Sequence, residues 1–486
     1  MTSDYIQDHQ LNAMRLAGRK VGAGRSGERA IEVFNPYTET LLGTVPKATL
    51  EEVRETFAIA QACQPTLSRY ERAAILNRAA ALIETRRDEV ANLITAESGL
   101  CLKDSLYEAG RVRDVLLFGA TEVLRDDGQI FSCDLTPHGK QRRVYTQRSP
   151  LLGVITAITP FNHPMNQVAH KVVPSIASNN RMVLKPSEKV PFSAILFADI
   201  LYEAGLPPGM LSVVTGDPRE IADELITNPL VDLVTFTGGV AIGKYIASKA
   251  GYRRVVLELG GNDPIIVMED ADIDEASTLA VQGSYKNSGQ RCTAIKRLLV
   301  HEAVAGQFVE QVLAKTLAWK YGDPTDRAND MGTVIDEAAA RLFESRVHEA
   351  VAQGAKLLAG NQRRGALYSP TLLDHVLPQM TVAREETFGP VSPVIRFRTI
   401  DEAIQISNGT AYGLSSAVCT NRMDYITRFV SELQVGTVNV REVPGYRLEL
   451  TPFGGIKDSG LGYKEGVQEA IKSFTNLKTY SLPWSG

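Results

Sequence analysis

The sequence predicts an α/β protein built around a parallel sheet. Between residues 150 and 261, short apolar runs rich in β-branched residues alternate with longer runs of helical periodicity. The predicted strands are Val154–Thr159, Met182–Lys185, Leu211–Thr215, Leu233–Thr237 and Val255–Leu259. The predicted helices between them are Met165–Ala177, Pro191–Ala204, Arg219–Ile226 and Ala241–Ala250. Each helix is long enough to connect two parallel strands, so the alternation is typical of a Rossmann-type layered domain.

A second α/β region follows, from about Gly260 to Phe453. Its predicted helices are Val304–Ala318, Glu337–Gln353 and Ile400–Asn408, and its predicted strands include Arg297–Val300 and Val394–Arg398. The segment Gln129–Arg148 differs, because a few apolar residues among polar ones predict a hairpin outside the main sheet. The C-terminal stretch from Ala470 ends in the strand-like run Leu477–Leu482. We expect these last two pieces to serve subunit contacts.

Composition restricts the classes of function. Of the 486 residues, 44% are hydrophobic and 22% charged, an ordinary globular mixture, and the net charge of −4 gives no reason to expect nucleic acid or an anionic membrane as a partner. No apolar run reaches the ~18–20 residues of a membrane span. The N-terminal stretch 1–19 lacks the apolar core of a secretory signal and carries acidic residues, unlike a transit peptide. We therefore expect a cytoplasmic protein.

The five cysteines do not form a recognisable framework. They are Cys63, Cys101, Cys133, Cys292 and Cys419. An odd number at wide spacing argues against disulfides and favours a reducing compartment. The sequence has no C-x-x-C pair and its seven histidines are scattered, so we expect no metal site.

Cys292 is the one cysteine in a setting that suggests chemistry. It follows the polar run Ser288-Gly289-Gln290-Arg291 and so has a permanent cation beside it. A cysteine attacks a carbonyl as the thiolate, and we expect Arg291 to lower the thiol pKa by Coulomb attraction. A lone cysteine is more often an inert buried side chain, but the other four lack any such setting. Cys292 is therefore the candidate nucleophile.

Two polar residues at predicted strand ends are candidates to assist Cys292. Glu258 closes an apolar strand and precedes Gly260-Gly261, at the edge where open α/β sheets bind ligands. Its carboxylate could take a proton from the thiol or from water, although a solvated strand-end acid is the plainer interpretation. Asn162 follows Pro160-Phe161, and its amide could donate a hydrogen bond to a developing oxyanion. The alternative for Asn162 is a simple turn-former.

Two further segments could hold a dinucleotide. In Lys185-Pro186-Ser187-Glu188, at the end of the second strand, an acid can accept hydrogen bonds from a ribose diol and the lysine can contact the same sugar edge. Phe236-Thr237-Gly238-Gly239 precedes a helix and could offer backbone amides to a phosphate. The usual G-x-G-x-x-G fingerprint is absent, and either segment alone could be a polar turn.

Seven motifs, in this order, together resemble the aldehyde dehydrogenase superfamily over essentially the whole chain. They are Pro160-Phe161-Asn162, Lys185-Pro186-Ser187-Glu188, Phe236-Thr237-Gly238, Glu258-Leu259-Gly260-Gly261, Gly289-Gln290-Arg291-Cys292, Glu385-Glu386-Thr387-Phe388-Gly389-Pro390 and Pro452-Phe453-Gly454-Gly455-Ile456-Lys457-Asp458-Ser459-Gly460.

The resemblance implies an enzyme and a domain plan. It implies a discontinuous NAD-binding domain (1–125 and 149–259), an α/β catalytic domain (260–455) and a small β oligomerisation arm (126–148 and 470–486). It also implies a homodimer or homotetramer.

The resemblance further implies a mechanism. Cys292 would attack the aldehyde to give a thiohemiacetal, whose oxyanion Asn162 and the backbone N–H of Cys292 would hold. After hydride transfer to NAD, Glu258 would activate the water that hydrolyses the thioester. The presence of Glu258 favours hydrolysis over transfer to coenzyme A.

The residues implied for the cofactor come from six segments. They are Ile158, Thr159, Pro160, Lys185, Ser187, Glu188, Gly216, Phe236, Thr237, Gly238, Gly239, Ile242, Leu259, Gly260, Glu386 and Phe388. Glu386 and Phe388 would hold the nicotinamide ribose and ring. NAD is favoured over NADP because Glu188 would repel a 2′-phosphate. Gly239 departs from many relatives, which have Ser there, so one side-chain contact to the cofactor phosphate is missing.

The choice of aldehyde depends on arginines. The implied substrate-binding residues are Arg111, His163, Arg291, Thr293 and Arg447. Arg111 is preferred over Arg113 because, on a helix over 104–124, it shares a face with Tyr107. Three guanidinium groups suggest a doubly charged anion, because their forked donors match phosphonate oxygens. The alternative is that these arginines form structural ion pairs or extend to solvent.

A narrower resemblance agrees with the arginines. The segments 130–140, 442–447 and 472–476 resemble the branch of the family that oxidises phosphonoacetaldehyde to phosphonoacetate with NAD. The alternatives are another phosphono-aldehyde such as phosphonoformaldehyde, a carboxylated substrate such as succinate semialdehyde, or a catalytically silent relative.

Overall fold

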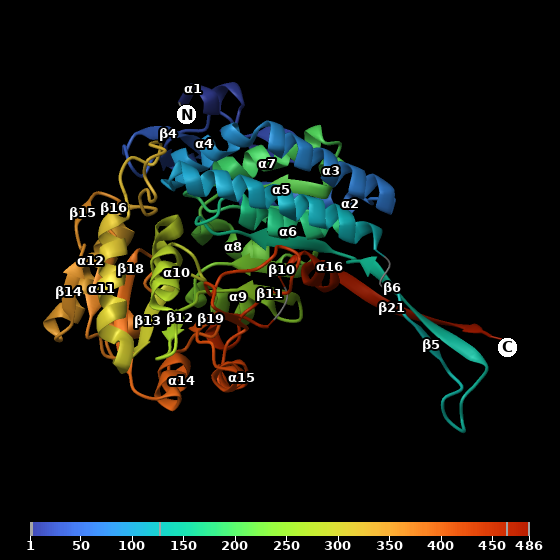
Figure 1. Cartoon of the computed structure of the whole chain (residues 1–486). Helices are drawn as coiled ribbons and strands as arrows, with labels where there is room; N and C mark the ends of the chain where they lie inside the picture. The colour runs from blue at the N-terminus through green and yellow to red at the C-terminus, as the bar shows by residue number, and fades with distance from the viewer. Residues whose placement is uncertain (1–2, 126–127, 463–464, 485–486) are drawn as a thin grey trace.

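The computed structural model of the chain describes residues 3–125, 128–462 and 465–484. Two seven-stranded sheets form the centre of the molecule (Figure 1). The first has the order β11 (Arg254–Glu258), β10 (Val231–Thr237), β7 (Val154–Ile158), β8 (Met182–Lys185), β9 (Leu211–Val213), β1 (Met14–Leu16) and β2 (Arg19–Val21). The five strands expected from the sequence are all present and mutually parallel. β1 and β2 add an antiparallel edge, so the sheet is mixed.

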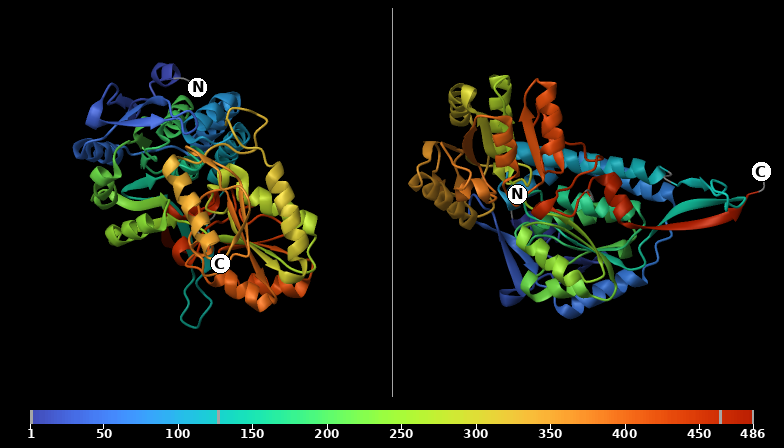
Figure 2. Two further views of the ribbon diagram at one scale, coloured as in Figure 1. Left: turned by 90° about the vertical axis from the view of Figure 1, so that its left-hand side faces the viewer. Right: turned by 90° about the horizontal axis from the view of Figure 1, so that it is seen from below.

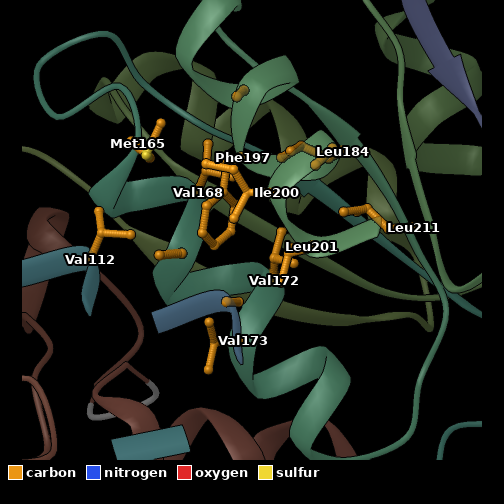
Figure 3. Packing of buried hydrophobic residues seen from close by; sticks show 14 of the residues in the cluster. Val112, Met165, Val168, Val172, Val173, Leu184, Phe197, Ile200, Leu201 and Leu211 are labelled. Atoms are coloured by element: carbon orange, nitrogen blue, oxygen red, sulfur yellow. The ribbon is translucent and has the colours of Figure 1, made fainter. Parts of the chain in front are cut away.

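Helices cover both faces of the first sheet. One face carries α2 (Leu50–Ala62), α8 (Pro218–Thr227) and α9 (Val240–Ala250). The other carries α6 (Asn166–Ala177) and α7 (Pro191–Glu203), with α3 (Arg69–Thr85), α4 (Arg87–Ser98) and α5 (Leu102–Leu124) outside them. Figure 3 shows Val112 of α5, Val168 of α6 and Phe197 of α7 packed in one apolar cluster. This packing holds α5 against α6 and α7, the helices that follow β7 and β8.

The second sheet has the order β14 (Lys356–Ala359), β17 (Thr371–Asp374), β18 (Val391–Phe397), β13 (Ile295–His301), β12 (Asp263–Val267), β19 (Ser415–Cys419) and β20 (Thr437–Val440). All its pairs are parallel except that of β14 with β17. Its helices are α10 (Ile273–Tyr285), α11 (Glu302–Ala318), α12 (Glu337–Ala352), α13 (Thr381–Arg384), α14 (Ile400–Asn408) and α15 (Met423–Glu432). They form separate apolar layers on its two faces.

A three-stranded arm projects from the body, as both Figure 1 and the right-hand view of Figure 2 show. It consists of β5 (Ile130–Ser132), β6 (Arg142–Pro150) and β21 (Thr475–Pro483), all antiparallel. The hairpin and the C-terminal strand expected from the sequence therefore pair with each other. Asp126, Asp127, Ser485 and Gly486 of the predicted arm, and Met1 and Thr2 of the predicted first segment, lie outside the described residues.

The remaining elements are short. They are α1 (Ser3–Asp8), β3 (Ala30–Phe34), β4 (Leu41–Pro46), β15 (Arg363–Arg364), β16 (Leu367–Tyr368), α16 (Val467–Ser473) and four 3₁₀ turns, η1 (Gly27–Arg29), η2 (Pro208–Met210), η3 (Lys286–Gly289) and η4 (Lys457–Ser459). Within the three described ranges, no helix combines the length and apolar character needed to cross a membrane.

Candidate active site

The segment before Cys292 is a tight turn with an unusual backbone. Asn287, Ser288 and Gly289 all have left-handed φ values, of 58°, 53° and 68°. A Cβ atom at Gly289 would lie 2.4 Å from the carbonyl carbon of Gly389, so only glycine fits there. The Nδ2 atom of Asn287 donates to the carbonyl oxygen of Asn162 at 3.0 Å. The turn thus joins the candidate nucleophile segment to the candidate oxyanion segment.

The thiol of Cys292 lies in an environment that disfavours its ionisation. Burial raises the thiol pKa to about 11, and Lys296 and then Arg447 act against this rise. Arg291, the activating cation favoured by the sequence, interacts electrostatically with Cys292, but the largest opposing effects on the thiol pKa come from Lys296 and Arg447. The Arg291 Nη2 atom donates to the carbonyl oxygen of Gly283 at 2.6 Å.

Lys296, which was not expected from the sequence, is hydrogen-bonded to the backbone of the nucleophile segment, residues 288–292. Its Nζ atom donates to the carbonyl oxygens of Cys292 at 2.7 Å and Arg291 at 2.8 Å, and its side chain is almost fully buried. Lys296 Nζ is also 3.4 Å from Glu386 Oε1. The only hint in the sequence was a lysine inside an otherwise apolar strand, which is rare unless the charge is paired.

Glu258 is buried at the end of β11. The strand continues into an antiparallel bridge with Gly460, and the Leu259 N–H donates to the carbonyl oxygen of Ser459 at 2.9 Å. A Cβ atom at Gly261 would lie 2.5 Å from the carbonyl oxygen of Cys292. The Glu258 strand end and the nucleophile segment are therefore in contact.

Glu386 and Phe388 close another side of the same region. The Gly261 N–H donates to Glu386 Oε1 at 3.0 Å. Phe388 meets Phe161, the residue before Asn162, edge to face at 5.9 Å between ring centroids. Four segments far apart in sequence thus converge around Cys292.

The remaining predicted cofactor residues gather at one edge of the first sheet. Ile158, Thr159 and Pro160 end β7; Lys185, Ser187 and Glu188 follow β8; Gly216 follows β9; Phe236, Thr237, Gly238 and Gly239 join β10 to α9; Leu259 and Gly260 follow β11. These are the carboxyl ends of parallel strands, where α/β sheets bind nucleotides.

The edge has features that fit a nicotinamide dinucleotide. Gly239 is the N-cap of α9, and no atom lies within 4 Å of a Cβ built there, so the backbone is open to a phosphate. Ile242, on the first turn of α9, is an apolar side chain that is 54% exposed and could cover an adenine ring. Lys185 Nζ lies 3.3 Å from Glu188 Oε2. The two side chains are therefore close enough together to contact the same ribose.

The predicted substrate arginines differ in their pairing. Arg111 points inward and forms a short ion pair with Glu449, whereas Arg113 pairs with Glu84 on the outer surface. Arg447 lies 3.8 Å above the ring of Phe453. Among the described residues, Nη1 of Arg447 and Nε of Arg291 are buried without a hydrogen-bond partner.

The two other predicted substrate residues are also held in place. His163 Nδ1 lies 3.3 Å from Glu108 Oε2 on α5. A Cβ atom at Gly445 would lie 2.4 Å from the Thr293 Oγ1, so Thr293 packs against the loop that carries Arg447.

Two buried acid–base pairs at the site were not expected from the sequence. Glu449 binds His170 Nε2 at 2.5 Å as well as Arg111, and despite its burial these cations hold its pKa well below the usual range. Lys171 Nζ donates to Glu465 Oε1 at 2.8 Å and to Thr235 at 3.1 Å. Each pair joins residues more than 250 positions apart, so no local pattern could have revealed them.

Comparison with known proteins identifies the family. Residues 23–480 match the aldehyde dehydrogenase family. The chain belongs to this family. It is 39% identical to a 3-sulfolactaldehyde dehydrogenase of Priestia aryabhattai over 93% of this chain and 94% of the relative. It is 37% identical to a sulfoacetaldehyde dehydrogenase of Neptuniibacter caesariensis over 92% of this chain and 98% of the relative.

A solved structure agrees. The NADP-dependent glyceraldehyde-3-phosphate dehydrogenase of Bacillus halodurans, in complex with NADP, matches with a TM-score of 0.93 and 37% identity over 98% of this chain and all of that one. The predicted fold class, an aldehyde-dehydrogenase-like α/β fold, is thereby confirmed, as is an oxidoreductase acting on aldehydes.

This aldehyde dehydrogenase has no cluster of His, Cys, Asp and Glu that could hold a metal ion within the part of the chain that the structure describes.

Proposed function

We propose that this aldehyde dehydrogenase oxidises a small aldehyde bearing a doubly charged anionic group, phosphonoacetaldehyde, to phosphonoacetate with NAD. The observation that carries the proposal is the arginine arrangement beside Cys292. Arg447 and Arg291 each keep one buried nitrogen without a hydrogen-bond partner among the described residues.

The balance of charge favours a dianion. Glu449 forms an ion pair with Arg111, whereas Arg447 and Arg291 form no direct ion pair among the described residues and interact with Glu449, Glu465 and Asp104 only at longer range. Burying an unpaired charge is costly unless a counter-ion arrives, and guanidinium groups match phosphonate oxygens well. A substrate with two negative charges would satisfy both donors, whereas an uncharged aldehyde would leave them desolvated and unpaired.

In the proposed reaction, the Cys292 sulfur bonds to the aldehyde carbon. The carbonyl oxygen becomes an oxyanion that the Asn162 side chain and the Cys292 backbone N–H stabilise by hydrogen bonds. The residues at the sheet edge would hold NAD, which would supply the hydride acceptor. Glu258 takes a proton from a water molecule as the water oxygen attacks the thioester carbon, and the Cys292 sulfur leaves as the thiolate.

NAD is proposed over NADP because Glu188 would repel a 2′-phosphate. The related structure from Bacillus halodurans contains NADP. The preference of this chain is therefore tested by comparing kcat/KM for NAD and for NADP. An NADP preference would contradict the role given to Glu188.

We also propose the domain plan of residues 1–125 with 149–259, 260–455 and 126–148 with 470–486, the last being an arm that joins subunits of a homodimer or homotetramer. Support comes from the apolar surface of the arm. Ile130, Phe131, Leu477 and Leu482 are each about half exposed, and exposed apolar side chains gathered on one element mark an interaction surface. Light scattering with and without residues 475–486 tests this.

A second candidate substrate is favoured by the relatives. Their names specify sulfolactaldehyde and sulfoacetaldehyde, which carry a sulfonate in place of a phosphonate. A sulfonate has the same tetrahedral oxygens but only one negative charge, so it would leave part of the positive charge of the site unmatched.

The test compares kcat/KM, with NAD, for phosphonoacetaldehyde, sulfoacetaldehyde and succinate semialdehyde. The proposal expects phosphonoacetaldehyde to lead. It further expects Arg447→Gln to lower kcat/KM for that substrate by about a hundredfold, the loss of a charge-assisted pair. A short uncharged aldehyde should be affected much less, because it loses only the influence of Arg447 on the Cys292 thiol.

Arg113→Gln is the matched control, because it removes one arginine from the outer surface. If sulfoacetaldehyde leads, the enzyme is a sulfo-aldehyde dehydrogenase. If succinate semialdehyde leads, or Arg447→Gln affects all aldehydes equally, the dianion argument is wrong.

A further inference from the structure

Two buried glutamates on neighbouring helices make the same unusual contact. Glu97, near the end of α4, is fully buried, and its Oε2 and Oε1 atoms accept hydrogen bonds from the Phe192 N–H at 2.8 Å and the Ser193 N–H at 2.9 Å. These two N–H groups belong to the first turn of α7. The contact therefore joins α4 to the helix that follows β8.

Glu108, on α5, repeats the arrangement one strand away. It is 1% exposed, and its Oε1 atom accepts hydrogen bonds from the N–H groups of Met165 and Asn166, both at 2.9 Å. These groups begin α6, and the second oxygen of Glu108 contacts His163. Glu108 therefore joins α5 to the helix that follows β7.

The physical reason for both contacts is the same. The first N–H groups of a helix have no partner within it and carry a partial positive charge. Neither α6 nor α7 has an N-cap side chain that accepts a hydrogen bond. The carboxyl group of a glutamate on α4 or α5 accepts hydrogen bonds from two of these donors at once. The same two hydrogen bonds give the buried carboxyl group the partners that it would otherwise lack.

The two helices start directly after the two loops that matter for the proposed reaction. The loop between β7 and α6 carries Asn162, and the loop between β8 and α7 carries Ser187 and Glu188. The strand fixes the first end of each loop. The glutamate fixes the second end, where the helix begins. A shift of a helix start by a fraction of an ångström would move the functional side chain only a few residues away.

We propose that Glu108 is a positioning residue for Asn162 and that Glu97 is a positioning residue for Glu188. Neither glutamate touches a reacting atom. The consequence is that oxyanion stabilisation and cofactor affinity are set by two separate contacts with the same outer helix layer. The inference rests on the proposed roles of Asn162 and Glu188.

The experiment compares Glu108→Met with Glu97→Met, and each variant is the control for the other. Methionine keeps the bulk of the side chain but removes both acceptor oxygens. Glu108→Met is expected to slow the single-turnover burst of NADH at saturating NAD about tenfold or more, with the Kd of NAD unchanged by calorimetry. Glu97→Met is expected to raise the Kd of NAD about tenfold and to leave the burst at saturating NAD unchanged.

Glutamine variants test the physical cause. Glutamine keeps one acceptor oxygen, so Glu108→Gln and Glu97→Gln should each recover part of the loss, which a general packing defect would not predict. Hydrogen exchange should quicken only in residues 159–166 for changes at Glu108 and only in residues 186–193 for changes at Glu97. If either methionine variant does not fold, its glutamine variant is read in the same assays.

The proposal is overturned if each variant alters both readouts equally, if neither readout moves, or if exchange quickens in both segments together. If the wild-type protein oxidises no aldehyde in the panel, the proposed function fails instead, and the hydrogen-exchange pattern still tests the two contacts.

Discussion

Replacement of Lys296 by methionine should make the Cys292 thiol markedly less reactive. Lys296 is the largest influence that lowers the pKa of this thiol against burial, which raises it to about 11. At pH 8 a thiol of that pKa is about one part in a thousand thiolate. Loss of a nearby cation commonly raises a pKa by about 1 to 2 units, so the thiolate fraction should fall about ten- to a hundredfold.

The same change should also destabilise the protein. Lys296 Nζ lies 3.4 Å from Glu386 Oε1, a separation at which Coulomb attraction is about 5 kcal/mol at an effective dielectric constant of ~20. Removing one partner of a buried pair typically costs about 3–5 kcal/mol, because the other charge remains buried. The variant should therefore unfold at a lower denaturant concentration.

The assay is the rate of Cys292 alkylation by iodoacetamide between pH 7 and pH 10, followed by peptide mass spectrometry. The rate should rise with pH in both proteins, because only the thiolate reacts, and it should be lower in Lys296→Met throughout. Lys171→Met is the matched control, since Lys171 is equally buried and pairs with Glu465 at 2.8 Å. It should destabilise the protein while leaving alkylation unchanged. Coincident profiles for Lys296→Met and the wild type would refute the reasoning.

Three further outcomes are expected. Gly239→Ser should raise the melting temperature slightly, by the equivalent of a few tenths of a kcal/mol, and tighten cofactor binding, because Gly239 is an extended N-cap with open space around it; a lower melting temperature would count against this. Gly289→Ala should reduce Cys292 alkylation at least about tenfold, since its φ of 68° and its contact with Gly389 exclude a Cβ atom; an unchanged rate would contradict it. Glu188→Gln should lower the NAD-to-NADP ratio of kcat/KM about tenfold by removing repulsion of the 2′-phosphate; an unchanged ratio would remove Glu188 as the determinant.

The sequence predicted those parts of the fold that depend on local pattern. The five parallel strands of the first sheet and the helices between them were found because each is a short apolar run with its own punctuation. The antiparallel strands β1 and β2 were not expected, since each has only three residues. Their position at the sheet edge depends on contacts with β9 that the local sequence does not encode.

The candidate site shows the same division. Cys292, Glu258 and Asn162 lie in motifs, so they could be selected in advance, and the structure brings their segments together. Lys296, Glu449 and the glutamates at 97 and 108 depend on partners that are distant in sequence. Arg291 shows that adjacency in sequence does not give the size of an effect, because its Nη2 atom donates to the carbonyl oxygen of Gly283 and Lys296 and Arg447 act more strongly on the Cys292 thiol.

The bridge between Glu258 and Gly460 has a consequence for synthesis of the protein. The ribosome makes the chain from its N-terminus, and the first sheet can assemble once residue 258 has emerged. The free side of β11 is covered only when Ser459 and Gly460 arrive, about 200 residues later. A nascent chain can therefore form its first sheet early, while the surroundings of Glu258 are completed near the end of translation.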